Sequence, residues 1–400
     1  MKESFFNKLL RVRIGDLFHI ILFVLALLPA LIYKKMRPHL WLICEYGDEA
    51  QDNGFAFFQY LVNAQPHVDA VYAIHRKSPA FPKVAALGKT VEYGSFKHWI
   101  YYLAAEGNIS SQKGGKPNAA VCYLFEVLLG IIRNKRVFLQ HGVICNDLPY
   151  LHQKKARLSL FCCGAKPEYE FVRNTFGYPD KVVQYLGLCR FDQLHGSQTD
   201  KDIVLVLPTW RTWLERDKSP RGRDAFLNSD YYHYWNALLQ DEGFSKLLDR
   251  WGKRAVFCLH RNMQAYETLF QSKNPRIRVV RWADADIPQL LLTAGVLVTD
   301  FSSVSMDFVY MEKPILYFQF DRDDFRKGHQ PVGYFDYDRD GFGPVCQTVP
   351  SLLTALEEIF SNGCEMADPY KQRVDSFYPL RDNKNCERTY KAVKSLLEGI

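Results

Sequence analysis

Short apolar runs alternate along the chain with longer segments whose apolar residues recur at helical spacing. Runs of about four to eight apolar residues bounded by polar or turn residues indicate buried strands, and the segments between them indicate helices. This alternation is typical of βαβ units, which form parallel sheets covered by helices on both faces. Strands are predicted at His39–Cys44, Val68–Ile74, Asn108–Ser111, Val137–Gln140, Leu158–Cys163, Ile203–Leu207, Ala255–Leu259, Ile277–Val280, Gly295–Thr299 and Pro314–Tyr317.

A polar stretch at residues 187–202 separates the first half of the predicted strands from the second half. At roughly 100–200 residues per domain, the 400-residue chain has the length of two domains. The pattern therefore predicts an α/β protein with two Rossmann-like domains facing one another across a cleft. The first would occupy residues 38–195 and the second residues 196–370. Residues 371–400 end in a helical pattern and are expected to pack back across the domains.

Residues 295–310 carry the most specific signal in the chain. They read as a buried strand, Val296–Thr299, then a tight loop, then a helix that begins near Ser302. Ligands of parallel α/β sheets bind outside the carboxyl ends of the strands, and the N–H groups at a helix N-terminus hold phosphate well. Asp300 and the serines are also ordinary N-cap residues. Taken alone, the stretch fits a phosphate site and a simple helix cap equally well.

The N-terminal segment joins an apolar run, residues 17–33, to an excess of positive charge. Residues 1–37 hold seven Lys and Arg against Glu3 and Asp16, and so supply +5 of the net charge of +7. The basic excess is therefore a terminal feature, which argues against nucleic acid as a partner. The run is slightly short for a spanning helix, and no clean signal-peptide cleavage site follows it. Cations on both flanks favour a membrane anchor at residues 1–37, lying in or dipping into an anionic surface, over a buried helix.

The ten cysteines contain no C-x-x-C pair and no zinc spacing. Several of them, such as Cys162 and Cys163, lie in apolar runs, where cysteine behaves as a small buried hydrophobic residue. Reduced thiols in the cytoplasm are therefore expected rather than a disulfide framework.

Two histidines directly follow predicted strands, where α/β proteins place reactive groups. His141 follows Val137–Gln140 and precedes Gly142, which permits a tight turn and the close approach of a ligand. His260 follows Ala255–Leu259. A histidine at such a position can transfer a proton near neutral pH or donate to phosphate oxygens. For either histidine alone, a structural role at a turn is the simpler alternative.

Other polar groups follow predicted strands in the same way. Thr209, Trp210 and Arg211 come after the first strand of the second half. Arg211 could clamp a phosphate and Trp210 could stack on a base, although packing alone would also explain both residues. Asp52 and Asn53 precede a predicted helix, so they fit acceptor binding and helix capping equally well.

Several common catalytic signatures are absent from the sequence. It contains no Walker A loop, no G-x-G-x-x-G, no H-E-x-x-H and no G-x-S-x-G, each of which places a known reactive group on a fixed turn. Their absence argues against a P-loop kinase, a dehydrogenase and a serine hydrolase.

Six short motifs, taken in their order and spacing, resemble the CDP-glycerol glycerophosphotransferase family, which includes teichoic-acid primases and polymerases. The resemblance runs from about Trp41 to Leu356. The motifs are Asp52-Asn53-Gly54, Gln140-His141-Gly142, Gly187-Leu-Cys-Arg-Phe-Asp192, Leu207-Pro-Thr-Trp-Arg211, Leu259-His260 and Thr299-Asp-Phe-Ser-Ser-Val304. Each motif is short, but chance does not explain all six together.

The resemblance implies a GT-B fold and a membrane-associated enzyme that works on the cytoplasmic face with a nucleotide-activated polyol phosphate. It implies that His141 is the base for the acceptor hydroxyl and that His260 helps to hold the donor pyrophosphate. Residues expected on the donor side are Thr209, Arg211, Asp300, Ser302 and Ser303, and those expected on the acceptor side are Asp52, Asn53 and Gly142. No metal or cofactor is required if helix N-termini and these side chains neutralise the phosphates.

These expectations combine into a transferase that moves a polyol phosphate, most simply glycerol phosphate, from a CDP-activated donor to a polyprenyl-linked or polysaccharide acceptor. The product would be a cell-surface polymer of the teichoic-acid or capsule type. CDP-ribitol stays open as the donor, and the choice between primase and polymerase stays open too. Two alternatives have different chemistry: a GT-B glycosyltransferase with a nucleotide-sugar donor, and a catalytically inactive GT-B scaffold.

Overall fold

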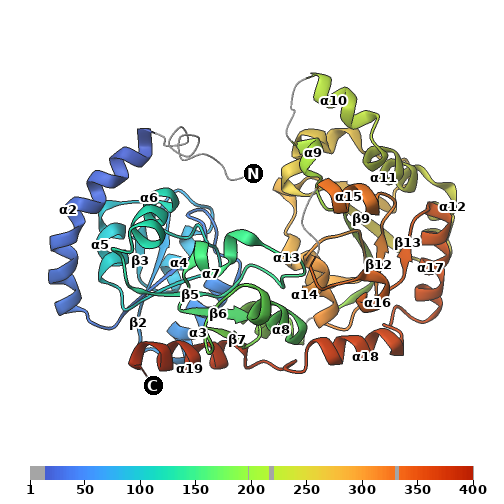
Figure 1. Cartoon of the computed structure of the whole chain (residues 1–400). Helices are drawn as coiled ribbons and strands as arrows, with labels where there is room; N and C mark the ends of the chain where they lie inside the picture. The colour runs from blue at the N-terminus through green and yellow to red at the C-terminus, as the bar shows by residue number, and fades with distance from the viewer. Residues whose placement is uncertain (1–13, 197, 216–219, 329–332, 400) are drawn as a thin grey trace. The chain divides into compact units, whose positions relative to one another are not determined.

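The computed structural model describes residues 14–196, 198–215, 220–328 and 333–399. The chain divides into two compact units, whose elements are labelled in Figure 1. The first unit consists of the described residues up to Val143, Leu148–Asp192 and the segment from Asp382 onward, and the second consists of Ile144–Asp147 and Gln193–Arg381. Each unit has a parallel sheet and an apolar core of its own.

The sheet of the first unit has seven parallel strands in the order β3-β2-β1-β4-β5-β6-β7. The strands are β1 Leu40–Cys44, β2 Asp69–Ile74, β3 Thr90–Glu92, β4 Gly107–Ser110, β5 Lys135–Phe138, β6 Leu160–Cys163 and β7 Val183–Tyr185. The strand order reverses between β1 and β4, which pair directly. In open α/β sheets such a reversal opens a crevice at the carboxyl ends of the strands, where ligands bind.

Helices cover both faces of this sheet. They are α2 Ile14–Met36, α3 Asn53–Ala64, α4 Phe81–Leu87, α5 Phe96–Ala104, α6 Ala119–Tyr123, α7 Gln153–Ala156, α8 Lys166–Thr175 and α19 Asn385–Glu398, with the short helical turns η1 Leu124–Leu128, η2 Pro149–Leu151 and η3 Cys189–Gln193. Side chains of β1 alternate between the two faces, as strand geometry requires. Trp41 and Ile43 enter the core under α3 and α19. Leu40 and Leu42 enter the core under α2 and α5.

The sheet of the second unit has six parallel strands in the order β10-β9-β8-β11-β12-β13. The strands are β8 Asp200–Leu207, β9 Arg254–Cys258, β10 Ile277–Val280, β11 Ala294–Thr299, β12 Ile315–Phe318 and β13 Val345–Cys346. Here the order reverses between β8 and β11. The two units therefore repeat one plan, a parallel sheet with a crevice-forming reversal near its centre.

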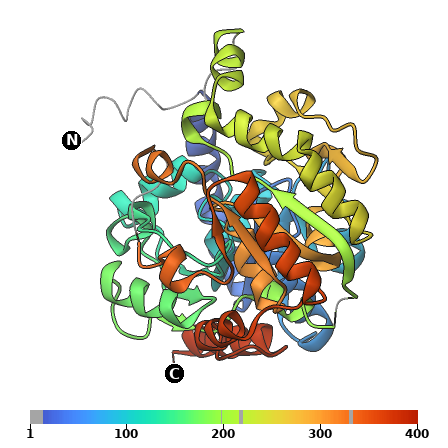
Figure 2. The same ribbon diagram turned by 90° about the vertical axis from the view of Figure 1, so that its right-hand side faces the viewer.

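The helices of the second unit are α9 Thr212–Glu215, α10 Pro220–Leu227, α11 Asp230–Gln240, α12 Glu242–Arg250, α13 Ile287–Thr293, α14 Val304–Tyr310, α15 Arg322–Gly328, α16 Tyr337–Asp340, α17 Val349–Ser361 and α18 Asp368–Phe377, with η4 Arg261–Leu269 and η5 Trp282–Asp284. Trp235, Phe244 and Leu352 belong to one core with Val204 and Val206 of β8. Figure 2 shows α17 lying over the sheet on the side that faces the viewer. Burial on both faces explains why residues 204–207 of β8 and the apolar part of β11 read as unbroken apolar runs.

All ten predicted strands are present, which confirms the prediction of an α/β chain with two parallel sheets. The sequence did not reveal β3, β7 and β13. These strands have two or three residues each and lie at sheet edges, so they bury too little apolar surface to leave a pattern. The predicted linker at 187–202 is partly structured, since it contains η3 and the start of β8; Ser197 within it lies outside the described residues.

The predicted membrane segment forms α2, a helix of 23 residues. Its length and composition suffice to cross a membrane. One stripe of the helix, Phe23, Ala26 and Ala30, is buried, and α2 packs along α5 on one side of the first unit (Figure 1). The cations expected to flank the anchor on its N-terminal side are Lys2, Lys8, Arg11 and Arg13, and these residues lie outside the described part of the chain.

Candidate active site

In the first unit, polar side chains gather where the strand order reverses. Glu45 and the α3 N-cap Asp52 follow β1, Gln112 follows β4, and His141 follows β5. Because these strands are parallel neighbours, their carboxyl ends meet at one edge of the sheet. The structure thus brings His141 and Asp52 together, a pairing that no pattern in the sequence predicts.

The imidazole of His141 is held through one ring nitrogen. Its Nδ1 lies 2.7 Å from Asp52 Oδ2, and the side-chain amide of Gln112 lies 2.6 Å from the same nitrogen. A carboxylate oxygen can only accept, so Nδ1 carries the proton and donates it to Asp52. The other nitrogen, Nε2, then holds the lone pair of the neutral ring. The side chain of His141 is 67% exposed, so this lone pair is available to a substrate hydroxyl.

The charges around His141 favour this state. Hydrogen bonding to Asp52 raises the pKa of His141 above its ordinary value, against the opposing effect of burial. Burial alone would raise the pKa of Asp52, but Arg190 and His141 hold it below its ordinary value. Arg190 donates from its guanidinium to Asp52 Oδ1 at 2.5 Å. Asp52 therefore stays ionised and can support a positive charge on His141 during proton transfer.

The turn that carries His141 is conformationally strained and heavily supported. Gln140 has a φ of 69°, a left-handed conformation that is costly for a residue with a Cβ. Its side chain donates to Glu168 at 2.7 Å, and its carbonyl accepts from the amide of Asn53 at 2.8 Å. Arg190 also donates to the carbonyl of His141 at 2.6 Å. These bonds fix the direction in which the imidazole leaves the backbone.

Glu45 supports the same site from below. It is fully buried and accepts backbone N–H groups of Gln51, Asp52 and Phe55 at 2.7–3.0 Å. Burial, reinforced by the charge of Asp52, raises the pKa of Glu45 to about 7. Its bonds hold the first turn of α3, the segment that carries Asp52.

The expected acceptor-side residues have different positions. Asp52 caps α3, accepting from the N–H of Asn53, and holds His141, so the two roles considered for it coexist. Asn53 is fully buried and bonded to the backbone of Gln140 and Arg190. The side chain of Asn53 therefore supports the turn at Gln140 in this structure, and its contact with an acceptor stays a prediction. Gly142 is half-buried beside His141.

In the second unit, the predicted donor residues follow three neighbouring parallel strands, β9, β8 and β11. His260 follows β9 and caps η4, accepting from the N–H of Asn262 at 3.2 Å through Nδ1. In the neutral ring the proton is therefore on Nε2, which is the opposite tautomer to that of His141. The ring of His260 lies 6.1 Å from that of Trp210 and 5.7 Å from that of Trp282. This histidine is thus arranged to donate, whereas His141 is arranged to accept.

Ser302 and Ser303 lie in the loop after β11, beside the reversal of strand order. Helix α14 begins at Val304, two residues later than the predicted start at Ser302. Ser302 accepts from the N–H of Val304 at 3.4 Å, and Ser303 is exposed at the N-cap position without a side-chain cap bond. Both hydroxyl groups are therefore accessible at the carboxyl edge of the sheet.

Arg211 and Asp300 do not lie on an accessible surface. Both side chains are fully buried. The guanidinium of Arg211 bonds to Asp300 Oδ2 at 2.8 Å, to both carboxylate oxygens of Asp321 and to the carbonyl of Thr209. Burial alone would lower the pKa of Arg211, but Asp300 and Asp321 raise it. The guanidinium and carboxylate are occupied inside the unit in this structure, and the contact of Arg211 and Asp300 with the donor stays a prediction.

This buried network instead shapes the two loops at the reversal. Asp300 Oδ1 accepts the N–H groups of Thr209 and Phe301 at 2.8 and 2.7 Å. It thereby ties the loop after β8 to the loop after β11. Thr209 is buried, and its hydroxyl has no hydrogen-bond partner among the described residues. Arg211 and Asp300 therefore position the loop that carries Ser302 and Ser303.

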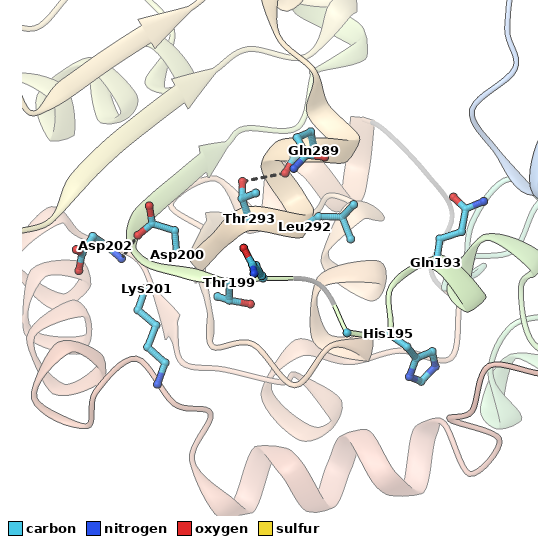
Figure 3. Close-up of a pocket in the computed structure, with 11 residues that line it drawn as sticks. Gln193, His195, Thr199, Asp200, Lys201, Asp202, Gln289, Leu292 and Thr293 are labelled. Atoms are coloured by element: carbon cyan, nitrogen blue, oxygen red, sulfur yellow. Dashed lines mark hydrogen bonds between the residues drawn. The ribbon is translucent and has the colours of Figure 1, made fainter. Parts of the chain in front are cut away.

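A separate cavity of about 860 Å³ lies in the second unit, at the opposite edge of the sheet (Figure 3). It is lined by the start of β8, by the end of α13 and by residues of the 187–202 stretch such as His195. Thr293 donates to the carbonyl of Gln289 on its wall. None of the predicted site residues lines this cavity, so it does not coincide with the candidate site.

Sequence reasoning missed three residues of the first-unit site: Arg190, Gln112 and Glu45. Arg190 stood inside a quoted motif, Gly187–Asp192, but that stretch was interpreted as linker. Its contact with Asp52 spans 138 residues of chain. Gln112 and Glu45 each follow a predicted strand, and that position was the available signal. The side-chain type did not distinguish them from many other polar loop residues.

Comparisons with known proteins agree with these features. Residues 172–395, more than half of the chain, match the family CDP-glycerol:poly(glycerophosphate) glycerophosphotransferase. The chain is 29% identical over 372 residues to the minor teichoic acid biosynthesis protein GgaB of Bacillus subtilis, covering 90% of this chain and 40% of GgaB. It is 23% identical over 268 residues to the teichoic acid poly(glycerol phosphate) polymerase of Bacillus spizizenii, covering 66% of this chain and 52% of the polymerase. The chain thus spans about half or less of the length of these curated relatives.

A solved structure of the wall teichoic acid polymerase TagF has the same fold. It superimposes with a TM-score of 0.66 at 16% identity, covering 99% of this chain and 98% of the TagF chain. This likeness confirms the predicted GT-B-like fold class. The family match extends from α8 to α19 and includes His260 and the two serines. The chain belongs to the CDP-glycerol:poly(glycerophosphate) glycerophosphotransferase family.

Proposed function

We propose that this protein transfers a polyol phosphate, glycerol phosphate in the first instance, from a CDP-activated donor to a hydroxyl group of a cell-surface polymer or its lipid-linked precursor. The observation that carries the proposal is the Asp52–His141 pair at the reversal of the first sheet. It combines an ionised carboxylate, a defined tautomer and an exposed Nε2, which are the requirements of a general base. Family membership supplies the donor class.

His141 starts the reaction by accepting the proton of the acceptor hydroxyl at Nε2. The hydroxyl oxygen then forms a bond to the β-phosphorus of the CDP-polyol, and the bond from that phosphorus to the bridging oxygen breaks. CMP leaves with the electron pair of that bond. Asp52 stabilises the imidazolium until the proton passes to water or to the leaving phosphate.

The donor phosphates bind in the second unit in this proposal. His260 donates through Nε2–H, and the hydroxyls of Ser302 and Ser303 donate to phosphoryl oxygens, where negative charge grows in the transition state. The buried Arg211 and Asp300 hold the loops of these groups in place. Trp210, half-buried beside His260, provides a flat apolar face for the nucleobase.

The choice of polyol rests on relatives that are longer than this chain. One is a poly(glycerol phosphate) polymerase, and another, 34% identical over 103 residues, is a poly(ribitol-phosphate) polymerase. CDP-glycerol is the first donor to test because the family description specifies it. CDP-ribitol is the second.

Helix α2 brings the protein to a membrane surface and lies in that surface rather than crossing it. Its inner stripe packs against the first unit. The ring of Phe23 stacks on that of Phe125, with centroids 4.0 Å apart, and His19 accepts a hydrogen bond from the indole of Trp99 at 3.0 Å. The opposite stripe is apolar and exposed, at Leu17, Phe18, Ile21, Val24, Leu25, Leu28, Leu31 and Ile32. Lys34 and Lys35 are exposed at its end, where cations meet anionic headgroups. The membrane face in this proposal is the cytoplasmic one.

The first experiment measures CMP release by the purified full chain. The donors are CDP-glycerol and CDP-ribitol, with and without a polyprenyl-linked saccharide acceptor, and a UDP-sugar serves as the third donor. We expect acceptor-dependent CMP release that His141→Ala abolishes, with a change in unfolding free energy of about 0.5 kcal/mol or less, since the side chain is exposed. His39→Ala, at an 80% exposed histidine of the same unit, is the matched control. Turnover of the UDP-sugar alone would overturn the proposal in favour of a glycosyltransferase, and no turnover at all would favour an inactive scaffold.

A further inference from the structure

A group of cations lies beside the candidate base in the first unit. Lys113 and Lys116 stand in the loop after β4, and Arg136 stands on the adjacent strand β5. All three line one cavity together with Gln112 and Ser110, and no acidic residue of the described chain lines it. The wall of this cavity is therefore strongly basic.

One buried carboxylate compensates part of this charge. Glu126 is fully buried and forms ion pairs with Lys116 and with Arg136, the latter at 3.0 Å. It also accepts from the hydroxyl of Tyr102. A single carboxylate between two cations leaves positive charge in a partly desolvated place, which is costly unless an anion joins it.

Lys113 is the cation that this carboxylate does not pair. Its ammonium donates to the carbonyl of Tyr150 and lies 5.5 Å from the ring of Tyr150 and 5.9 Å from that of Tyr123. It makes no ion pair with a described residue. Burial and repulsion from Lys116 and Lys155 lower the pKa of Lys113 to about 8. An anion at this point would relieve both the desolvation and the repulsion.

Arg136 provides a second unsatisfied donor on the same cavity. The residue is 9% exposed, and its Nε has no hydrogen-bond partner among the described residues. Buried donors in native proteins are normally paired, so an orphan guanidinium N–H points to a missing acceptor. The enclosed space is only about 30 Å³, which holds ordered water rather than a phosphate. An oxyanion would therefore have to bind at the mouth, at Lys113, with water linking it to Arg136.

The cavity is connected directly to the base. Gln112 precedes Lys113 in the chain and lines the cavity, while its side-chain amide lies 2.6 Å from Nδ1 of His141. Lys113 is thus the chain neighbour of Gln112, the residue that contacts the proposed base His141. A phosphate bound there belongs to the molecule that carries the reacting hydroxyl.

We propose that Lys113, backed by Lys116 and Arg136, forms a phosphate subsite that holds the acceptor next to His141. The ligand is a phosphate monoester, phosphodiester or diphosphate group, supplied by the terminal unit of a growing polymer or by a lipid carrier. The inference rests on the proposed function for the identity of the acceptor. The subsite itself is read from geometry and charge and can be tested without turnover.

A binding test uses the reactivity of Lys113. The full chain is acylated at pH 8 with an amine-specific reagent, alone, with sn-glycerol 3-phosphate or with farnesyl diphosphate, and modified lysines are quantified by peptide mass spectrometry. We expect either ligand to slow acylation of Lys113 several-fold while leaving Lys154, an exposed lysine of the same unit, unchanged. Protection by glycerol phosphate alone assigns the subsite to a polymer end, and protection by the diphosphate alone assigns it to a lipid carrier. Equal protection of both lysines, or of neither, would overturn the subsite.

A kinetic test uses Lys113→Gln, with Lys154→Gln as the matched control and thermal melting as the check on folding. We expect Lys113→Gln to raise KM for a phosphorylated acceptor about tenfold or more and to leave KM for CDP-glycerol unchanged. A change confined to the donor KM would contradict the assignment. If the wild-type chain releases no CMP from any CDP donor, the proposed function fails, and the protection experiment still decides whether the phosphate subsite exists.

Discussion

The proton affinity of His141 depends on a carboxylate that lies 89 residues earlier in the chain. Asp52 fixes the tautomer through Nδ1, and Arg190 keeps Asp52 ionised. The exposed Nε2 is therefore both basic and accessible. The bond to Asp52 raises the pKa of the ring, whereas burial by itself would lower it. At the scale of single residues, the contacts of Asp52 with His141 and Arg190 distinguish His141 from a histidine with a purely structural role.

Replacing Asp52 by Asn tests this arrangement. The hydrogen bond that raises the pKa of His141 is lost with the charge, so that pKa falls. Since the deprotonated ring is the active form, the acidic limb of the kcat profile moves to lower pH, while kcat itself drops about 10²–10⁴-fold, the range for general-base catalysis. The measurement is a kcat–pH profile.

Asn is as good an N-cap as Asp, so helix α3 should survive the Asp52→Asn change, and circular dichroism provides the control. An acidic limb that stays in place would mean that Asp52 does not tune the base. A limb that moves to higher pH would contradict the sign of the argument.

Arg211 is a residue whose role depends on burial. Its guanidinium neutralises Asp300 and Asp321 in the interior, and it lies over the ring of Phe325 at 4.9 Å. Removing one partner of a buried ion pair leaves the others uncompensated, which typically costs about 3–5 kcal/mol. Arg211 therefore stabilises the loops that follow β8 and β11.

We accordingly expect Arg211→Ala to lower the free energy of unfolding by about 3–5 kcal/mol, read from the urea midpoint. Arg261→Ala, at an exposed arginine of the same edge, should change it by about 0.5 kcal/mol or less. A stable Arg211→Ala protein with a raised KM for the donor would instead return Arg211 to direct phosphate contact.

At the scale of elements, helix α2 has two different faces. Phe23, Ala26 and Ala30 are buried against the first unit, whereas Leu25, Leu28 and their neighbours point outward. A helix that crossed a bilayer would need about 30 Å of its length within the hydrocarbon core, away from the surface of the first unit. The contacts of α2 with α5 therefore favour a helix that keeps one face on the protein and gives the other to the membrane surface.

Two sets of variants separate the faces of α2. Leu28→Gln with Leu31→Gln should lower co-sedimentation with phosphatidylglycerol vesicles and leave the melting temperature nearly unchanged, because both side chains are exposed by more than 60%. Phe23→Ala should lower the free energy of unfolding by about 3–5 kcal/mol, since its ring is buried. Unchanged sedimentation of the double Gln variant would rule out the outer stripe as the membrane contact.

The elements also differ in how well they could be predicted from the sequence. Strand β11 and the second half of β8 are buried on both faces, so their apolar runs were plain. Edge strands such as β3 and β13 are too short to produce such a run. Helix α14 begins at Val304 and not at the predicted Ser302. Two consecutive serines are both good cap residues, and only the loop geometry decides between them.

At the scale of the whole molecule, each unit places its candidate residues at the carboxyl edge of a parallel sheet, next to the reversal of strand order. This is where parallel α/β folds leave strand ends uncovered by a crossover helix. The same plan appears twice, with a histidine that carries its ring proton on Nδ1 in the first unit and a histidine that carries it on Nε2 in the second. The likeness to TagF extends over nearly the whole chain, whereas the curated relatives are longer.

The sequence by itself determined what depends on local order along the chain. Apolar periodicity located the ten longer strands, the apolar run located α2, and the position directly after a strand marked His141, His260 and the two serines. These features follow from neighbours within about a dozen residues, and the pattern of side chains over such a window fixes secondary structure and strand ends.

The tertiary structure alone decided which of these polar residues meet and which are hidden. It paired His141 with Asp52 and Arg190, enclosed Arg211 with Asp300, and buried Asn53 beneath the turn it supports. The physical reason is that solvent access and charge pairing depend on contacts across 89 to 138 residues of chain. Such contacts cannot be predicted from residue type and local spacing, so the accessibility and charge state of these side chains depend on the folded structure.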